Sequence, residues 1–346
     1  MAVKLQLNDI SDCKIGGGSV TSIRLGTELV WPDSPTPYSS QYLTTEMMGG
    51  GTISLADAGS NVFYYSKDNG STWGSLTTGQ TVNVVTGDKV LWKASGLTIS
   101  SSDGIGTIKP SASFRVYGNV MSLEYGDNFS GQTTMRDYNF LGLFYADSTL
   151  MVASNLVLPA TTLSTGCYRS MFSGCSGLTT TPELPATTLA DSCYWNMFGN
   201  CRSLTTAPSL SATTLADSCY NSMFYFCTSL TVAPTLPATT LTMYCYGGMF
   251  YGCRSLTTAP ELPAATLTDY CYYRMFAACT SLNYIKCLAT DISANNCTTA
   301  WVQGVASSGT FHKAPIMCDW TTGNNGIPSN WTVDPDDCGV GAGDAD

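Results

Sequence analysis

A 26-residue period in the second half of the chain constrains the fold more than any other feature of the sequence. Leucine recurs at this interval from Leu158 to Leu184 and onward, and the Met-Phe pair that begins at Met171 recurs at Met197. A fixed period between about 20 and 50 residues is typical of repeat proteins in which each unit packs against its neighbours. The sequence therefore predicts a solenoid in which one repeat forms one rung.

Two cysteines recur in every repeat and are separated by seven residues. The first column is Cys167, Cys193, Cys219, Cys245 and Cys271, and the second column is Cys175, Cys201, Cys227, Cys253 and Cys279. Free cysteine behaves as a small apolar residue and is readily buried. We therefore interpret both columns as a structural ladder in the core.

Three alternatives for these cysteines fit the spacing less well. Disulfides need a specific Cβ geometry that regular stacking does not automatically provide, and the 15 cysteines of the chain cannot all pair. Zinc sites commonly use two cysteines two to four residues apart, together with histidine. A nucleophilic thiol needs a neighbouring base, and the chain has a single histidine, His312.

Each repeat combines two local patterns. The segment Cys-Tyr-x-x-Met-Phe-x-x-Cys-x-x-Leu, as at 193–204, has spacings that predict a short helical or 3₁₀ segment with one buried face. The segment that follows, such as APELPAATL at 259–267, contains two prolines that bias the residues before them toward an extended backbone. We therefore expect one compact turn and one short strand in each repeat.

The rest of the chain divides where its composition changes. Residues 1–31 form an N-terminal attachment segment with a predicted β hairpin around Gly26, and 32–37 are a Pro-rich linker. Residues 38–130 hold five to seven short strands, with an Asn69-Gly70 hairpin turn, and predict a small all-β, sandwich-like domain. We assign 131–290 to the solenoid, 291–333 to a Trp-rich C-terminal cap and 334–346 to an acidic tail. The expected fold class is mainly β.

The repeat resembles the BspA-like leucine-rich repeats, whose motif runs A-F-x-x-C-x-x-L-x-x-(I/V)-x-(L/I)-P. The stretch MFYGCRSLTTAPELPAATL, at 249–267, follows this motif with Met-Phe in place of Ala-Phe, and the resemblance covers about 144–287. It implies a leucine-rich-repeat solenoid on a cell surface or a virion surface, with a binding function and no catalysis.

Two shorter stretches resemble segments of Bacteroidetes proteins. VTSIRLGTELVWP, at 20–32, is similar to a short N-terminal motif of structural proteins of Bacteroidetes phages of the crAss-like type and of prophages. The closing stretch from GVASSGTFHKAP to GIPSNWTV, within 304–333, resembles the C-terminal segment of Bacteroidetes repeat proteins. The first resemblance implies a virion structural protein that docks on other virion proteins through its N-terminal part.

Charge and hydropathy narrow the function classes. A formal net charge of −10 argues against a nucleic-acid partner, because phosphate contacts need clustered Lys and Arg. No stretch of about 18 uncharged apolar residues occurs, so we expect no membrane insertion. The first residues lack the apolar region of a secretory signal, so we expect synthesis in a cytoplasm. The acids of the repeats are spread singly, so we expect no enzyme, no cofactor and no metal.

Residues that vary between repeats are the candidates for binding, because constant columns build the core. These candidates are Arg169, Trp195, Arg202, Tyr225, Tyr251, Arg254, Tyr273 and Arg274. The constant Tyr column leaves two interpretations open, namely a ladder packed along the rod and a row of rings that stacks on glycans or partner side chains. That column is Tyr168, Tyr194, Tyr220, Tyr246 and Tyr272.

These observations favour a phage virion appendage, such as a head fibre, tail fibre or decoration protein. Its N-terminal region would contact other virion proteins, and its solenoid would contact a protein or glycan of the host surface. Fibres of this kind are commonly dimers or trimers, so we expect a homo-oligomer. The alternative is a bacterial cell-surface leucine-rich-repeat adhesin, which would require export.

Overall fold

The computed structural model describes residues 14–15, 18–19, 23–25, 28–31 and 37–334, and the predicted acidic tail lies almost entirely outside them. The described chain is mainly β and contains several sheets. Near the N-terminus, β1 (Lys14–Ile15) pairs with β2 (Gly18–Ser19), and β3 (Ile23–Leu25) pairs antiparallel with β4 (Glu28–Trp31). The second pair confirms the hairpin predicted around Gly26.

Residues 38–130 form two sheets that share a core. The strands are β5 (Leu43–Met47), β6 (Gly51–Ala56), β7 (Phe63–Ser66), β8 (Gly74–Leu76), β9 (Thr81–Val84), β10 (Lys89–Lys93), β11 (Thr107–Pro110) and β12 (Phe114–Asn119), followed by a short helix α1 (Ser122–Tyr125). One sheet has the order β12-β5-β10-β7-β8 and is extended beside β12 by a later strand, β13 (Leu150–Val157); the other sheet has the order β11-β6-β9. Alternation along β10 turns Val90 and Trp92 inward, where both are fully buried.

The predicted Asn69-Gly70 turn is present between two paired strands. Asn69 and Gly70 both have positive φ, in the loop of the β7–β8 hairpin. β9 and β10 lie on either side of Gly87, but β9 pairs with β6 whereas β10 pairs with β5 and β7. The chain therefore crosses from one sheet to the other at Gly87 instead of forming a hairpin there.

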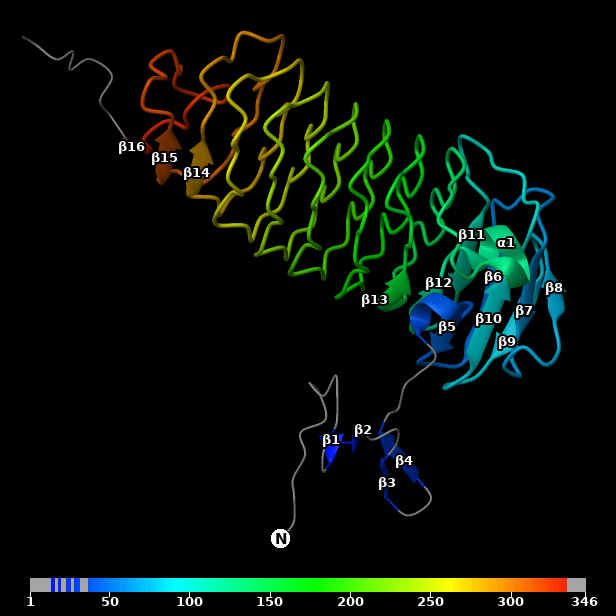
Figure 1. The fold of residues 1–346 in the computed structure, drawn as a ribbon. Coiled ribbons are helices and arrows are strands. Elements are labelled where there is room, and N and C mark those ends of the chain that lie inside the picture. Colours follow the sequence, from blue (N-terminus) through cyan, green and yellow to red (C-terminus); the bar gives the residue numbers. More distant parts are fainter. Residues whose placement is uncertain (1–13, 16–17, 20–22, 26–27, 32–36, 335–346) are drawn as a thin grey trace, which may run out of the picture.

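The β domain and the repeats are joined by a shared strand. β13 (Leu150–Val157) runs parallel to β12 at the edge of the six-stranded sheet. On its other side, Val152 forms a bridge with Thr180 of the first full repeat. The six-stranded sheet therefore continues into a stack of coils that extends away from the β domain (Figure 1). The largest hydrophobic core likewise runs through both parts without interruption.

The turns of each rung follow an alternating pattern of backbone hydrogen bonds. In the rung that contains Cys193, the N–H of Trp195 donates to the Ser192 carbonyl (3.2 Å), and this bond closes a turn within the rung. The N–H of Tyr194 donates instead to Cys219 of the next rung (3.0 Å). The same alternation holds for the following residues and in later rungs, so the backbone groups of this segment are bonded either within a rung or between rungs.

The prediction of a helical or 3₁₀ segment was wrong. Residues 158–283 contain turns and isolated bridges but no helix and no longer strand. Positive φ recurs at every fourth residue, as at Ser192, Asn196 and Asn200. These residues occupy the third position of alternate turns, where a type II turn requires positive φ. A helix is about 10 Å wide, so it would not fit between rungs that bond to each other about 4.8 Å apart.

This pattern points residues inward and outward in successive pairs. In the Cys193 rung, Cys193 and Tyr194 are buried, as are Met197 and Phe198. The positions between these pairs are Ser192, Trp195, Asn196, Gly199 and Asn200, and all of them except the buried Gly199 are partly exposed. We call these positions, together with their equivalents at 26-residue intervals in the rungs of Cys167 to Cys297, the turn face.

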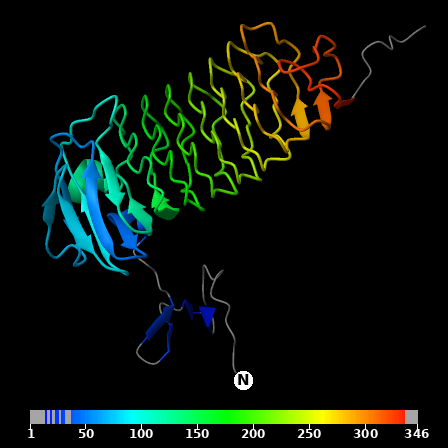
Figure 2. The same cartoon turned by 180° about the vertical axis from the view of Figure 1, so that it is seen from behind.

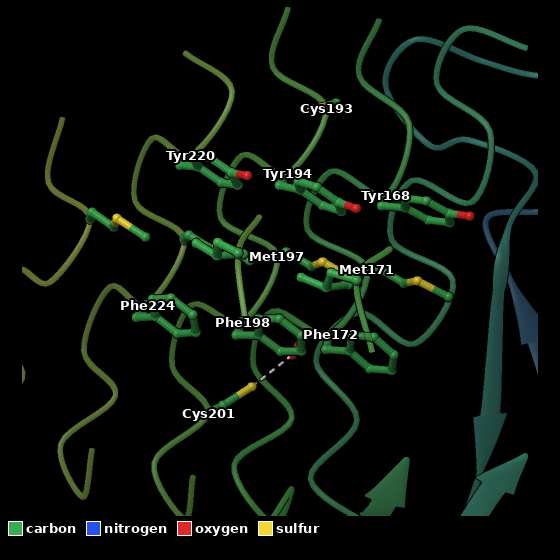
Figure 3. Close-up of a cluster of buried hydrophobic side chains, with 14 of the residues drawn as sticks. Tyr168, Met171, Phe172, Cys193, Tyr194, Met197, Phe198, Cys201, Tyr220 and Phe224 are labelled. Atoms are coloured by element: carbon green, nitrogen blue, oxygen red, sulfur yellow. Dashed lines mark hydrogen bonds between the residues drawn. The ribbon is translucent and has the colours of Figure 1, made fainter. Parts of the chain in front are cut away.

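The inward aromatic residues form two continuous stacks (Figure 3). One stack runs through Phe140, Tyr168, Tyr194, Tyr220, Tyr246, Tyr272, Trp301 and Trp320, with neighbouring ring centroids 5.5–6.3 Å apart. The other runs through Phe144, Phe172, Phe198, Phe224, Phe250 and Phe276 at 5.4–5.8 Å. The Tyr column is at most 2% exposed, so the ladder interpretation is confirmed and the glycan-stacking alternative for this column was wrong.

The C-terminal end of the stack is closed by a short parallel sheet and by tryptophans. β14 (Tyr284–Cys287), β15 (Thr310–Lys313) and β16 (Thr332–Asp334) pair in that order. Trp301 stacks on the last ring of the Tyr column, and its indole N–H donates to the Gly326 carbonyl. These residues cover the last rung at the end of the stack opposite the β domain (Figure 2). No helix in the described part of the chain has the length and hydropathy of a membrane span.

The turn pattern makes a testable prediction at two adjacent alanines. Ala278 has a φ of 60° in the left-handed region, whereas the buried Ala277 is not among the residues with positive φ. An L-residue in the left-handed region costs about 1–2 kcal/mol, and glycine avoids this cost. We expect Ala278→Gly to maintain or raise the melting temperature and Ala277→Gly to lower it. Equal losses in the two variants would contradict the alternating turns.

The Tyr stack predicts an unusual response at Tyr194. Its hydroxyl is buried and has no hydrogen-bond partner among the described residues. Removing an unsatisfied buried hydroxyl relieves a desolvation cost of about 1–3 kcal/mol, so Tyr194→Phe should increase the free energy of unfolding. Tyr194→Ala removes a ring from the core and should reduce it by about 3–5 kcal/mol. Denaturant titration measures both, and a loss of stability in Tyr194→Phe would contradict this account.

Candidate binding surface on the turns of the repeats

The ten cysteines of the two columns are free and fully buried. In the second column each thiol donates to the carbonyl oxygen of a phenylalanine in the preceding rung, as from Cys201 Sγ to Phe172 (3.2 Å; Figure 3) and from Cys227 Sγ to Phe198 (3.1 Å). The columns therefore form the predicted ladder, with the thiols as weak donors between rungs. Cys318 lies outside both columns and is disulfide-bonded.

Burial also suppresses the reactivity of these thiols. Desolvation raises the pKa of Cys193, Cys227 and Cys245 to about 12. The thiolate is the nucleophile and metal ligand of cysteine, so a buried neutral thiol is inert in both roles. In the part of the chain that the structure describes, no group of three or more His, Cys, Asp or Glu side chains is placed to hold a metal ion.

Six of the eight candidate binding residues lie on the turn face. Arg169 and Trp195 come from successive rungs, and the guanidinium carbon lies 4.0 Å from the indole ring centroid in a cation–π contact. Tyr225, Tyr251, Tyr273 and Arg274 lie further along the same face. Arg202 and Arg254 are exposed just beyond it, after the second cysteine column, and neither forms an ion pair with the described residues.

Two aromatic groups occupy the middle of the turn face. In the first, Tyr225 stacks on Tyr251 at 5.0 Å, and Phe226 lies edge-on to both rings at 4.7 and 5.3 Å. In the second, Tyr244 stacks on Tyr270 at 4.4 Å, and Tyr273 lies edge-on to both at 6.2 and 5.9 Å. These six rings are partly exposed, in contrast to the buried inward stacks.

Three of these aromatic residues were missed from the sequence, namely Phe226, Tyr244 and Tyr270. The variable columns used for the prediction were the two residues after the constant Tyr, the residue after the second Cys and the position of Tyr225 and Tyr251. Phe226 instead directly precedes the second Cys of its repeat, and Tyr244 and Tyr270 precede the first Cys. The alternation of inward and outward pairs would have identified all three, since each lies at an outward position. That alternation follows from the turn pattern, which the helical interpretation obscured.

Glycines of one rung allow these rings to lie close to the backbone. A Cβ atom at Gly252 would come within 2.7 Å of the Phe226 ring. A Cβ atom at Gly247 would lie 3.1 Å from the Tyr244 ring and 3.0 Å from Asn221 Nδ2. Side chains at these positions would displace the rings, so the glycines help to define the arrangement of both aromatic groups.

The backbone under these bulky side chains is strained. Phe226, Tyr244, Tyr270 and Arg274 have φ between 53° and 57°. Equivalent positions in other rungs hold Gly, Ser or Asn in most cases, which tolerate this region better or carry smaller side chains. A non-glycine residue in the left-handed region costs about 1–2 kcal/mol, so these four side chains are placed at the expense of stability. Strain of this kind is concentrated at functional sites.

Charge is distributed unevenly around the rungs. The turn face carries Arg169 and Arg274 and has no acidic residue at its positions. The aspartates of the repeats precede it by one residue, and they accept backbone N–H groups of the next rung. These bonds run from Asp217 N to Asp191 Oδ1 (3.2 Å) and from Met243 N to Asp217 Oδ1 (3.0 Å). The turn face is therefore neutral to basic in a chain with net charge −10.

Two polar cavities lie outside the middle of this face. One of about 710 Å³ lies on the β domain, where Lys67 and Asp88 are engaged in a 2.7 Å ion pair. A smaller one of about 270 Å³, at the junction with the first rungs, is lined by Asp103 and Arg169 among others. In the smaller cavity the Ser102 hydroxyl donates to Asp103 Oδ2 at 2.6 Å.

No protein-family model matches this chain, and neither the curated proteins nor the solved structures include a match.

The buried thiols predict a loss of stability at alkaline pH. Folding raises their pKa values to about 12 at Cys193 and Cys227, whereas an unfolded thiol ionises near pH 8.5. Between these values the unfolded chain binds fewer protons, so the free energy of unfolding should fall as pH rises from about 9 toward 12. Cys227→Ala should reduce the number of protons released on unfolding in this pH range by about one, and the free energy of unfolding should then fall less steeply with pH. Rapid reaction of the native ladder thiols with Ellman's reagent at pH 8 would contradict their burial.

Proposed function

We propose that this protein is a non-enzymatic binding protein of a phage virion surface. The observation that carries the proposal is the division of each rung into constant residues that are buried and variable residues that face outward, as for Tyr194 against Trp195. A rung built in this way keeps its core while the outward residues change. The protein thus supplies a scaffold for recognition and needs no catalytic groups.

We assign the stack to the leucine-rich-repeat solenoids of the BspA-like type. The recurring Cys, Leu and Pro columns support this assignment, as do the bonds between rungs at 26-residue intervals, such as the Thr188–Thr214 bridge. The chain departs from the usual plan in one respect, since residues 158–283 contain isolated bridges in place of a continuous sheet. At the C-terminal end of the stack, β14, β15 and β16 pair as a continuous parallel sheet.

The virion assignment rests on the resemblance of residues 20–32 to phage structural proteins. The arrangement of the chain is compatible with it, because the stack extends from the β domain toward a closed distal end (Figure 2). In this proposal the N-terminal region contacts other virion proteins, and the turn face contacts a protein or glycan of the host surface. The protein acts as a dimer or trimer, without nucleic acid or cofactor. A bacterial surface adhesin is the competing proposal.

Fractionation distinguishes the two locations. If the protein belongs to a virion, mass spectrometry of density-purified particles should recover it in a fixed ratio to the major capsid protein. An adhesin would instead be recovered in the envelope fraction of uninfected bacteria that encode it. Recovery from the envelope together with absence from purified particles would overturn the virion proposal and leave the binding role of the turn face in place.

A further inference from the structure

We propose that the two aromatic groups of the turn face, together with Arg274, bind an acidic saccharide. The binding residues are Tyr225, Phe226, Tyr251, Tyr244, Tyr270, Tyr273 and Arg274. The inference rests on the binding role proposed above and specifies the chemical class of the ligand.

Stacked tyrosine pairs provide flat apolar areas of fixed orientation. Tyr244 and Tyr270 lie nearly parallel, with 13° between their planes, and Tyr273 packs against both rings edge-on. The pair Tyr225 and Tyr251 is nearly parallel as well, with 20° between planes. A ring that is held in place by its neighbours loses little side-chain entropy on binding. The C–H face of a pyranose is flat and apolar, and it complements the electron-rich face of such a ring.

Polar groups at the edge of these rings are suited to hydroxyl and carboxylate groups. The Tyr270 hydroxyl accepts a hydrogen bond from Asn296 Nδ2 at 2.9 Å, which fixes its orientation and leaves its own proton to donate. Arg274 is exposed, and its guanidinium carbon lies 5.2 Å from the Tyr273 ring centroid. Arginine binds a carboxylate through two parallel hydrogen bonds, which favours an acidic sugar over a neutral one.

The backbone provides an independent argument. Tyr244 and Tyr270 share a column with Ser192 and Ser218, and all four residues have positive φ. The rungs with serine form the same turns, so folding does not require an aromatic residue in this column. Phe140 and Tyr168 also combine a large side chain with positive φ, but both are fully buried in the ring stack. Tyr244 and Tyr270 are partly exposed, so a ligand explains their size better than packing in the core does.

The extent of the site favours a saccharide over other macromolecules. The seven residues belong to three successive rungs, which span roughly 10–15 Å along the stack. A protein interface uses about 20–30 residues on each side, and the neighbouring turn-face positions Gly247, Gly248 and Ala277 provide no further anchors. Single-stranded nucleic acid also stacks on aromatic rings, but its phosphates need more than one arginine in a chain of net charge −10.

The test uses the purified full-length chain and immobilised polygalacturonate, alginate, hyaluronate and heparin, with dextran and mannan as neutral probes. We expect binding to at least one acidic polysaccharide, weaker binding at high salt, and at least tenfold weaker binding to the neutral probes. The variants Tyr270→Ser and Arg274→Ser place at each position a residue that the same column already contains, at Ser218 and Ser222. Each should weaken binding at least tenfold without lowering the melting temperature.

Two matched controls remove the same chemical groups elsewhere. Arg202 was a candidate from the sequence but lies beyond the turn face and outside the assigned site, and Arg202→Thr restores the residue of its own column at Thr228. Tyr64→Ser removes a tyrosine that is 42% exposed on the β domain. Both should change binding less than twofold. If Arg202→Thr and Arg274→Ser weakened binding equally, the loss would reflect net charge alone, and the assigned site would be overturned.

Three other outcomes would also overturn the inference. These are the absence of binding to all four acidic probes, equal binding to dextran, and unchanged binding in Tyr270→Ser. Attachment to host cells that is lost after protease treatment but survives periodate oxidation would identify a protein partner and reject the saccharide. None of these outcomes bears on whether the protein is found in purified particles, so the virion proposal stands or falls separately.

Discussion

Alternation of the backbone hydrogen bonds determines the arrangement of the repeats. Every second N–H closes a turn within its rung, and the intervening N–H groups bond to the next rung, as for Trp195 and Tyr194. Side chains consequently point inward and outward in pairs, and equivalent residues lie directly above one another. The two ring stacks, the thiol contacts to phenylalanine carbonyls and the composition of the turn face all follow from this pattern. A helical rung would bond only to itself and would leave its neighbours held by side chains alone.

The sequence was sufficient for what depends on periodicity and insufficient for what depends on local backbone geometry. The 26-residue spacing correctly predicted the buried cysteine ladder, and six of the eight residues proposed for binding lie on the turn face. It did not reveal the turns, because side chains at i, i+4, i+5 and i+8 lie on one side of a helix as well as of this turn chain. Positive φ at Tyr244 or Arg274 is equally hidden in the sequence, since neither residue favours it. The missed residues Phe226, Tyr244 and Tyr270 are a direct consequence.

The structure of the junction between the β domain and the repeats could not be predicted from the sequence either. Composition placed a boundary near residue 130, yet β13 pairs with β12 and forms a bridge with the first full repeat. A sheet that continues through the boundary prevents the stack from rotating freely about it. Both ends of the stack are covered as well. The β domain covers the first rung, and Trp301 and its neighbours cover the last one. Terminal rungs of a repeat stack need such covers, since each has only one neighbour.

Stability and the proposed binding role make opposite demands on the turn face. Serine or glycine would fit the left-handed positions with less strain, and several rungs use them there, at Ser192, Ser218 and Gly248. The rungs that contain Tyr244, Tyr270 and Arg274 retain strained backbone under large side chains, and the buried ring stacks below them offset this cost. The core of each rung is nearly constant, and most residues with positive φ lie at outward positions, although Phe140 and Tyr168 have positive φ within the buried ring stack. A scaffold of this kind tolerates changes in its binding residues, because the interactions that hold the rungs together involve other side chains.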